Sequence, residues 1–261
     1  MTTALPVLFI SHGSPMHAVE PSQAATDWAA EARRISRPRA ILMVSAHWES
    51  SLPLVSGAAQ PQTIHDFGGF PDELYRIRYA APGAPDVAQE VVSCLQAAGI
   101  QSGVEGFRGL DHGAWVPLLK MYPAADVPVL QLSVQPELGA AHHLALGRAI
   151  ASLRERGVLI VASGHMTHNL RDYMMSWRGV KQDAYALEFR DWITARLLAD
   201  DLPALVEWEA RAPHARRAHP TTEHFMPFFV ALGAGAAAGR PQRFHDSLEQ
   251  GVLAMDAWRW G

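Results

Sequence analysis

Cysteine is almost absent from the chain. Cys94 is the single cysteine among 261 residues, so the chain has neither an internal disulfide nor a thiolate cage for a metal. We expect Cys94 to lie in the core, on the apolar face of a helix. The N-terminus also lacks the basic segment of a secretory signal, since only a few apolar residues precede Ser11. Both absences favour a cytoplasmic protein.

Long apolar runs and an excess of one charge are missing as well. No run approaches the roughly 18 apolar residues that a membrane span needs, so we expect no membrane partner. The 22 basic and 26 acidic residues give a net charge of −4 and form no long runs, which argues against nucleic acid as a partner. Walker loops, dinucleotide-binding glycine patterns and nucleophile elbows are also absent.

The apolar pattern predicts an α/β fold in a single domain over residues 1–261. With 49% apolar residues, the chain can bury a large core. Four apolar runs without polar alternation are typical of parallel strands buried on both faces, and they span residues 6–10, 40–46, 127–134 and 158–162. Helices are expected over residues 24–35, 85–98, 118–122, 138–156, 181–199, 204–208 and 220–233. We therefore expect a central, mostly parallel sheet flanked by helices.

Three other segments have a weaker pattern. Residues 52–55 are expected to form a short strand, and residues 63–71 an irregular loop rich in glycine and aromatics. Such a loop is typical either of a pocket wall or of a plain surface loop. After residue 233, glycines among alanines predict a flexible linker followed by a short terminal segment.

Histidine is the residue in excess, with 13 copies against 5 tyrosines. His12, His47 and the pair His165/His168 each follow a different apolar run, just where the predicted strand ends. Because ligands of open α/β sheets bind beyond the carboxyl ends of the parallel strands, these side chains are expected to meet. Imidazoles suit zinc, iron, copper and nickel. The sequence thus predicts a metal site at this edge of the sheet.

A further ligand is expected from the segment around residues 214–224. His214 lies beside arginines and is typical of a surface residue, whereas His219 stands where a helix cap belongs. We prefer His224, at the beginning of a predicted helix. Elsewhere, His112 follows Asp111, a carboxylate that either orients the imidazole or caps a helix.

The remaining histidines, His17, His65, His142, His143 and His245, follow no pattern. Among them only His65, in the glycine-aromatic loop, is assigned to a pocket.

Six short motifs, in order along nearly the whole chain, carry a resemblance to a known family. They are Ser11-His12-Gly13-Ser14-Pro15, Ser45-Ala46-His47-Trp48, the loop from Ile64 to Pro71, Leu110-Asp111-His112-Gly113-Ala114-Trp115, Thr167-His168-Asn169-Leu170 and Pro220-Thr221-Thr222-Glu223-His224. The chain resembles the class III (LigB-type) extradiol ring-cleavage dioxygenases, in the branch similar to DOPA 4,5-dioxygenases. The motifs are specific as a set.

The resemblance implies a non-haem Fe(II) enzyme that opens the ring of a catechol with O2. Better-known relatives of the wider superfamily hold iron with two histidines and a glutamate. Here the resemblance implies the ligands His12, His47 and His224, with His168 either completing the set or acting beside it. Glu223 is a less favoured candidate for the third ligand, in place of His224. An all-histidine set also suits Zn(II), which is often found in members of this branch.

The resemblance also suggests roles for the other motif residues. His112 is our first choice for acid-base catalysis and His168 the second. Phe67, Phe70 and Trp115 are expected to wall the ring pocket, with core packing as the alternative. The substrate is expected to be DOPA, caffeate or a related phenylpropanoid catechol.

Two other functions stay open from the sequence. One is a zinc-dependent hydrolase, and the other is a non-catalytic metal-binding module on the same fold. The surface pattern favours neither a monomer nor a dimer.

Overall fold

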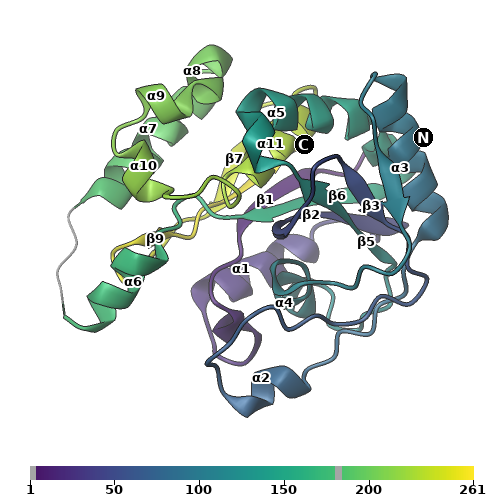
Figure 1. Cartoon of the computed structure of the whole chain (residues 1–261), viewed down its shortest axis with the longest axis horizontal. Coiled ribbons are helices and arrows are strands. Elements are labelled where there is room, and N and C mark those ends of the chain that lie inside the picture. The colour runs from purple at the N-terminus through teal and green to yellow at the C-terminus, as the bar shows by residue number, and fades with distance from the viewer. Residues whose placement is uncertain (1–3, 180–183) are drawn as a thin grey trace.

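An eight-stranded sheet runs through the centre of the computed structural model, which describes residues 4–179 and 184–261 (Figure 1). Its strand order is β4-β3-β5-β2-β6-β1-β10-β7, and β8 and β9 form a separate ribbon. The strands are β1 Val7–Ser11, β2 Ala40–Glu49, β3 Leu54–Ser56, β4 Gly103–Glu105, β5 Val129–Val134, β6 Val158–Gly164, β7 Gln242–His245, β8 Leu248–Glu249, β9 Leu253–Ala254 and β10 Ala257–Trp260.

The middle of the sheet is parallel. Strands β5, β2, β6 and β1 are neighbours and run in the same direction. Every residue of β1, β5 and β6 is buried, because helices cover both faces of the sheet. These are the four strands that the apolar runs predict, so the predicted α/β fold class with a central, mostly parallel sheet is confirmed. The short strand β3 also lies where it is expected.

The short terminal segment expected after the glycine-rich linker forms strands. Strand β10 pairs antiparallel with β1, and β7 pairs with β10, so the C-terminal segment completes the sheet. The carbonyl oxygen of Asp256 accepts hydrogen bonds from both the backbone N–H and the hydroxyl of Ser11, at 3.2 and 2.9 Å. Trp258 and Trp260 are buried. Pairing with β1, which is remote in sequence, fixes these residues as strands.

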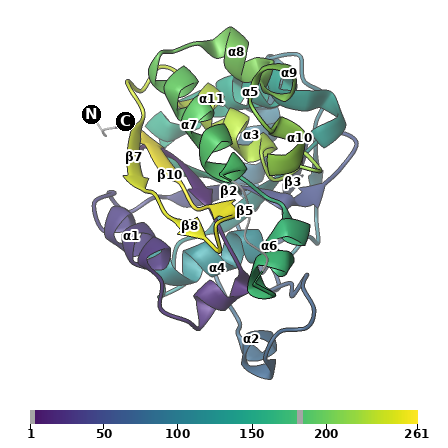
Figure 2. The ribbon, with the colours of Figure 1, turned by 90° about the vertical axis from the view of Figure 1, so that its left-hand side faces the viewer.

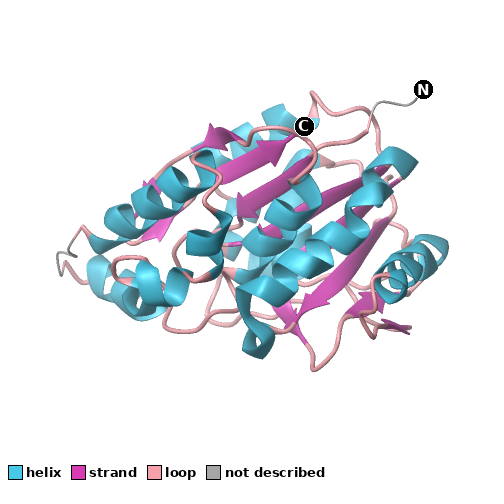
Figure 3. Cartoon of the chain, turned by 90° about the horizontal axis from the view of Figure 1, so that it is seen from above, coloured by secondary structure: helices cyan, strands magenta, loops and turns pink. Residues whose placement is uncertain are grey.

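The helices lie in layers on both sides of the sheet (Figure 3). They are α1 Gln23–Ala32, α2 Asp72–Arg76, α3 Pro85–Ala97, α4 His112–Met121, α5 Gly139–Ile150, α6 Leu170–Trp177, α7 Tyr185–Leu198, α8 Leu202–Val206, α9 Trp208–Arg211, α10 Ala215–Ala218 and α11 Met226–Gly235, with 3-10 turns η1 Pro15–Ala18, η2 Pro136–Leu138 and η3 Ala151–Arg156. Helices α5 and α11 pack together on one face, and α1 and α4 on the other (Figure 1).

Two glycines allow α5 and α11 to lie very close together. A Cβ atom at Gly147 would overlap the carbonyl oxygen of Val230, and one at Gly233 would overlap that of Leu144. Any side chain at either position would therefore force the two helices apart. This contact holds α11 against β6 and fixes the segment before it.

Helices α6 to α10 project beyond one end of the sheet, away from the two termini (Figures 1 and 2). The helix expected over residues 181–199 corresponds to α7, and residues 181–183 lie outside the described residues. Five apolar residues of α7 are buried: Tyr185, Ala186, Phe189, Ile193 and Leu197. Within residues 4–179 and 184–261, no helix is long and apolar enough to cross a membrane.

The helix expected to begin at Pro220 begins six residues later. Helix α11 begins at Met226, with Pro227 in its first turn, and residues 220–225 form turns. The backbone N–H of Phe225 bonds to the Thr222 carbonyl, and the His224 carbonyl bonds to a neighbouring loop instead of continuing a helix. His224 thus lies in the turn before α11.

Cys94 is only partly in the core. It is half-buried on α3, where it packs against the core, and its sulfur accepts a hydrogen bond from the Arg156 guanidinium at 2.9 Å.

Candidate metal centre

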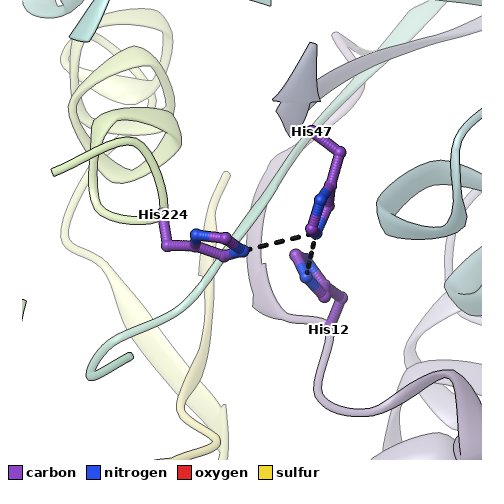
Figure 4. A group of neighbouring side chains, drawn as sticks. All are labelled: His12, His47 and His224. Atoms are coloured by element: carbon purple, nitrogen blue, oxygen red, sulfur yellow. Dashed lines mark hydrogen bonds between the residues drawn. The ribbon is translucent and has the colours of Figure 1, made fainter. Parts of the chain in front are cut away.

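Three histidines from distant parts of the chain point their Nε2 atoms at one another (Figure 4). His12 follows the end of β1, His47 lies near the end of β2, and His224 lies in the turn before α11. The Nε2 atom of His47 is 3.0 Å from that of His12 and 3.3 Å from that of His224. The strand-end positions thus bring His12 and His47 together, as the sequence predicts.

The neighbours of these rings fix where their protons lie. The Ser163 hydroxyl donates to the carbonyl of Gly113, so it must accept from Nδ1 of His12, 3.0 Å away. Nδ1 of His224 donates to the carboxylate of Glu223 at 2.7 Å. Glu223 therefore holds the ring of His224 through Nδ1, while Nε2 of the same ring faces His47.

Nδ1 of His47 faces a carboxylate as well. It lies 3.4 Å from Oδ2 of Asp66. In all three rings the proton therefore belongs on Nδ1, and the three Nε2 lone pairs face a common point. Such outer partners are the usual way in which a protein orients metal-binding imidazoles.

The spacing and charge of the cluster fit a bound cation. Two nitrogens each about 2.0–2.1 Å from one metal ion, at angles of about 90–109°, lie about 2.8–3.4 Å apart. The two short Nε2 separations, 3.0 and 3.3 Å, match this spacing. Burial lowers the pKa of His12 and His224 well below its ordinary value, so both rings are neutral at pH 7. Burial and the nearby His112 lower the pKa of His47 to about 4.

Close backbone packing holds His224 in this position. Its carbonyl oxygen accepts a hydrogen bond from the backbone N–H of His165 at 2.7 Å. A Cβ atom at Gly164 would overlap that same oxygen. The absence of a side chain at the end of β6 therefore lets the turn before α11 reach the sheet.

Asp66 is a site residue that the sequence did not single out. Its Oδ1 atom lies 3.0 Å from Nδ1 of His112 and also accepts the backbone N–H of that residue at 2.9 Å. Burial alone would raise the pKa of Asp66, but its contacts with His112 and His47 lower it to about 2. One carboxylate thus orients two histidines. Its position in the glycine-aromatic loop, beside His65, is the signal that could have indicated it.

Asp111 does not orient His112, because it caps α4. Its carboxylate accepts hydrogen bonds from the backbone N–H of Ala114, the hydroxyl of Ser45 and the amide of Gln131. It also accepts from Arg108, which donates to the carbonyl of His47 too. Of the two readings of Asp111, the helix cap is the observed one, and its link to the site is indirect.

His168 lies beside the three-nitrogen group. Its ring stacks on that of His224, and it belongs with Glu223 and His224 to a second group whose ligand atoms lie within 4.8 Å of one another. Burial lowers the pKa of His168 to about 3, so the ring is neutral.

The other candidate histidines have structural partners. Nε2 of His165 accepts the backbone N–H of Gly13 at 2.9 Å, so this nitrogen is occupied. Nε2 of His219 donates to the carbonyl of Met166 at 2.9 Å, and the ring stacks on Phe225. His214 is exposed and pairs with Glu188, as expected of a surface residue.

A cavity with a volume of about 730 Å³ opens over the cluster. Its histidines are His12, His47, His112, His165, His168 and His224, and Phe67 and Phe70 form part of its wall. His65 and Trp115, which were expected in the wall, do not line it. Trp115 is fully buried and donates to the carbonyl of Ile64, and His65 turns to the carbonyl of Ile77. Both rings pack behind Phe67 instead.

Comparisons with a family model and with known proteins point to the same family. Residues 6–250 match the family model described as the catalytic LigB subunit of aromatic ring-opening dioxygenase. A protein named 4,5-DOPA dioxygenase extradiol from Beta vulgaris is 40% identical over 256 residues, which cover 97% of this chain and 95% of that protein. The protein of the same name from Escherichia coli K12 is 38% identical over 259 residues, covering 97% and 94%.

A solved structure agrees with these relatives. The crystal structure of an uncharacterized protein from Escherichia coli K12 superposes with a TM-score of 0.84 at 33% identity, covering 98% of this chain and 100% of that one. The similarity in sequence and fold extends over nearly the whole chain. The chain therefore belongs to the LigB family of aromatic ring-opening dioxygenases, as an extradiol ring-cleavage enzyme.

Proposed function

We propose that this protein uses Fe(II) held by His12, His47 and His224 to open the ring of a catechol beside its two hydroxyls. The observation that carries the proposal is the group of three Nε2 lone pairs that face one point at the carboxyl ends of β1 and β2. Three neutral imidazoles leave room for further ligands on a metal ion. When bound, iron supplies the Lewis-acid and one-electron chemistry that brings a catechol and O2 together. Zn(II) fits the same donors and is the ion expected to compete.

His112 is assigned the proton transfers. Its Nδ1 atom faces Asp66, which leaves Nε2 as the nitrogen available to a substrate. The ring lines the cavity, and its centroid lies 4.0 Å from that of His47. We infer that His112 accepts a proton from a catechol hydroxyl and returns it to the ring-opened product. A positioned acid-base group of this kind contributes about 10²–10⁴-fold to the rate.

We infer that His168 and Phe67 hold the substrate in position. His168 stands in the same cavity on the side of His224, and Phe67 contacts the edge of the His112 ring, with centroids 5.6 Å apart. An aromatic substrate between them meets an apolar face on one side and a neutral hydrogen-bonding ring on the other. The relatives named for DOPA cleavage support a catechol with a side chain, of the DOPA or phenylpropanoid type.

The test is anaerobic loading with Fe(II), followed by exposure of a catechol panel to O2. We expect stoichiometric O2 uptake and a yellow ring-opened product. His12→Ala, His47→Ala and His224→Ala should each lose bound metal, whereas His214→Ala, on the surface, should keep both metal and activity. Absence of O2 uptake with every catechol, together with ester or amide hydrolysis by the zinc-loaded protein, would contradict the proposal and favour a hydrolase.

A further inference from the structure

A histidine outside the metal centre links a carboxylate to a hydroxyl. Nδ1 of His245, at the end of β7, lies 2.7 Å from Oδ2 of Asp27 on α1. Nε2 of the same ring lies 2.8 Å from the hydroxyl oxygen of Ser247. Because a carboxylate only accepts hydrogen bonds, the ring proton belongs on Nδ1, and Nε2 accepts the proton of the hydroxyl. This is the connectivity of a Ser-His-Asp triad, which is recognised by geometry and not by order in the sequence.

Rigid surroundings hold the three side chains in place. His245 is buried where β7 pairs with β10, and helix α1 packs beside β7 (Figure 2). The amide of Gln23 donates to the other carboxylate oxygen of Asp27 at 2.8 Å. The Ser247 carbonyl accepts the backbone N–H of Met255 at 2.9 Å, which fixes the loop that carries the hydroxyl. In the described part of the chain, that hydroxyl bonds to His245 alone.

The three side chains line a cavity of their own. Its volume of about 650 Å³ is within the range of pockets for small molecules. Among the described residues, it shares none of its lining with the cavity over the histidine cluster. Part of the wall is apolar and consists of Leu198, Pro241, Phe244 and Trp258. The guanidinium of Arg243 also lines the cavity, and it is paired with Asp246 and Asp256.

Two hydrogen-bond donors at this cavity have no acceptor. The hydroxyl of Thr194 and the indole N–H of Trp258 are buried, and neither makes a hydrogen bond to a described residue. Both residues line the cavity. Buried polar groups are nearly always paired, so unpaired donors beside a cavity indicate a ligand that supplies the acceptor. The carbonyl and ether oxygens of an ester are acceptors of this kind.

We propose that Ser247, His245 and Asp27 form a second catalytic site, which hydrolyses small esters with an apolar acyl group. The site is independent of the proposed ring cleavage. The Ser247 oxygen attacks the carbonyl carbon of the ester, and its proton passes to Nε2 of His245. His245 then gives this proton to the alcohol oxygen as the C–O bond breaks, which leaves the acyl group on Ser247.

Water completes the cycle. A water molecule adds to the acyl carbon and gives a proton to Nε2 of His245. The carboxylic acid leaves as the bond to the Ser247 oxygen breaks, and the proton returns to that oxygen. Asp27 keeps the Nδ1 proton throughout and stabilises the positive charge of the ring, so it acts as a positioning residue.

Covalent capture of the nucleophile tests the site. The protein is treated with 4-nitrophenyl butyrate and, separately, with a fluorophosphonate, each with and without a metal chelator. We expect release of 4-nitrophenol and phosphonylation of Ser247, detected as a mass increase of its peptide, at equal rates in both conditions. Failure of the fluorophosphonate to modify Ser247 would overturn the proposal. Hydrolysis that disappears with the chelator would also overturn it, because that reaction would belong to a metal.

Substitutions separate catalysis from a structural role. Ser247→Ala and His245→Gln should each lower the rate of ester hydrolysis by about 10²-fold or more. Asp27→Asn offers an amide N–H to Nδ1 of His245, so the ring proton moves to Nε2, which then no longer accepts from Ser247. For this variant kcat should fall by a comparable factor, with KM little changed.

Ser93→Ala is the matched control, because it removes an exposed hydroxyl on α3. It should leave both labelling and hydrolysis unchanged. Hydrolysis by Ser247→Ala at the rate of Ser93→Ala would overturn the proposal, as would full labelling of Ser247 in Asp27→Asn.

Discussion

The imidazole of His168 lies flat against that of His224, with ring centroids 3.5 Å apart and planes inclined by 11°. This stack supports one of the proposed metal ligands and places a second neutral ring in the cavity. The two roles, packing and chemistry, make different predictions for substitutions.

Replacement of His168 should separate these roles. We expect His168→Ala to keep metal at the other three histidines but to lower kcat by about 10²-fold, because a hydrogen-bonding ring is lost from the cavity. His168→Phe keeps a stacking ring without its nitrogens, so kcat should stay equally low. Metal content by elemental analysis and steady-state kinetics check both variants. Normal kcat in the phenylalanine variant would show that His168 only packs.

Loss of the Asp66 carboxylate should reduce activity. Asp66→Asn leaves His112 and His47 without the charge that orients them, and we expect kcat/KM to fall by about 10–100-fold.

His112→Ala should keep metal and lose turnover. Normal turnover of His112→Ala would refute its catalytic assignment.

Asp111 provides the matched control, because it is a buried carboxylate with a structural role. Asp111→Ala removes the cap of α4 and leaves Ser45, Gln131 and Arg108 without their partner, so the free energy of unfolding should fall by about 1–3 kcal/mol. Thermal unfolding measures this loss of stability in Asp111→Ala.

A single methyl group at the end of β6 should weaken metal binding. In Gly164→Ala the new Cβ collides with the His224 carbonyl, so the turn before α11 must move and we expect metal affinity to fall by about tenfold or more. Gly103→Ala on the edge strand β4 is the control, because its Cβ would lie 3.6 Å from Leu54, an ordinary contact. Competition with a metal chelator measures both. Equal affinities would show that His224 does not depend on this close packing.

The stability of the protein should fall as the pH drops below 6.5, partly because of His143. This ring is buried, accepts the backbone N–H of Gln135 through Nε2 and donates from Nδ1 to the carbonyl of Gly139. Burial lowers the pKa of His143 from 6.5 to about 4. Between these values the unfolded chain binds a proton that the folded chain does not, which destabilises the folded state by up to about 3 kcal/mol near pH 4 and not at all above pH 7.

Urea unfolding of the parent protein and of His143→Gln from pH 8 to pH 4 isolates this contribution from that of the other buried histidines. The variant should be less stable at pH 8 but lose less stability on acidification. Parallel curves would show that His143 does not take up the proton.

The strands that carry the site can be predicted from the sequence because each strand is buried on both faces. Such strands need unbroken apolar residues, and their ends are marked where His12 and His47 interrupt the run. The convergence of these two histidines could therefore be predicted from the parallel arrangement alone. No strand precedes His224 directly, so its prediction as a ligand rests on its place at the beginning of a predicted helix and on the resemblance.

Other parts of the site depend on contacts between distant segments. Asp66 meets His112 across a separation of 46 residues, and nothing near Asp66 in sequence marks it as the partner. Asp111 is adjacent to His112 but turns to cap its own helix. Likewise, β10 is a strand because β1 offers it an edge, and residues 220–225 are turns because the His224 carbonyl bonds to His165. Local propensity contains none of this information.

The pairing of β10 with β1 has a consequence for synthesis on the ribosome. Strand β1 emerges first, yet its neighbours in the sheet, β6 and β10, are translated much later, and His224 also lies in the last part of the chain. His12 and His47 must therefore wait for His224 until this late segment has been translated. Contacts of such long range form slowly. Binding of a metal ion by all three histidines should accordingly follow synthesis of the segment that contains His224.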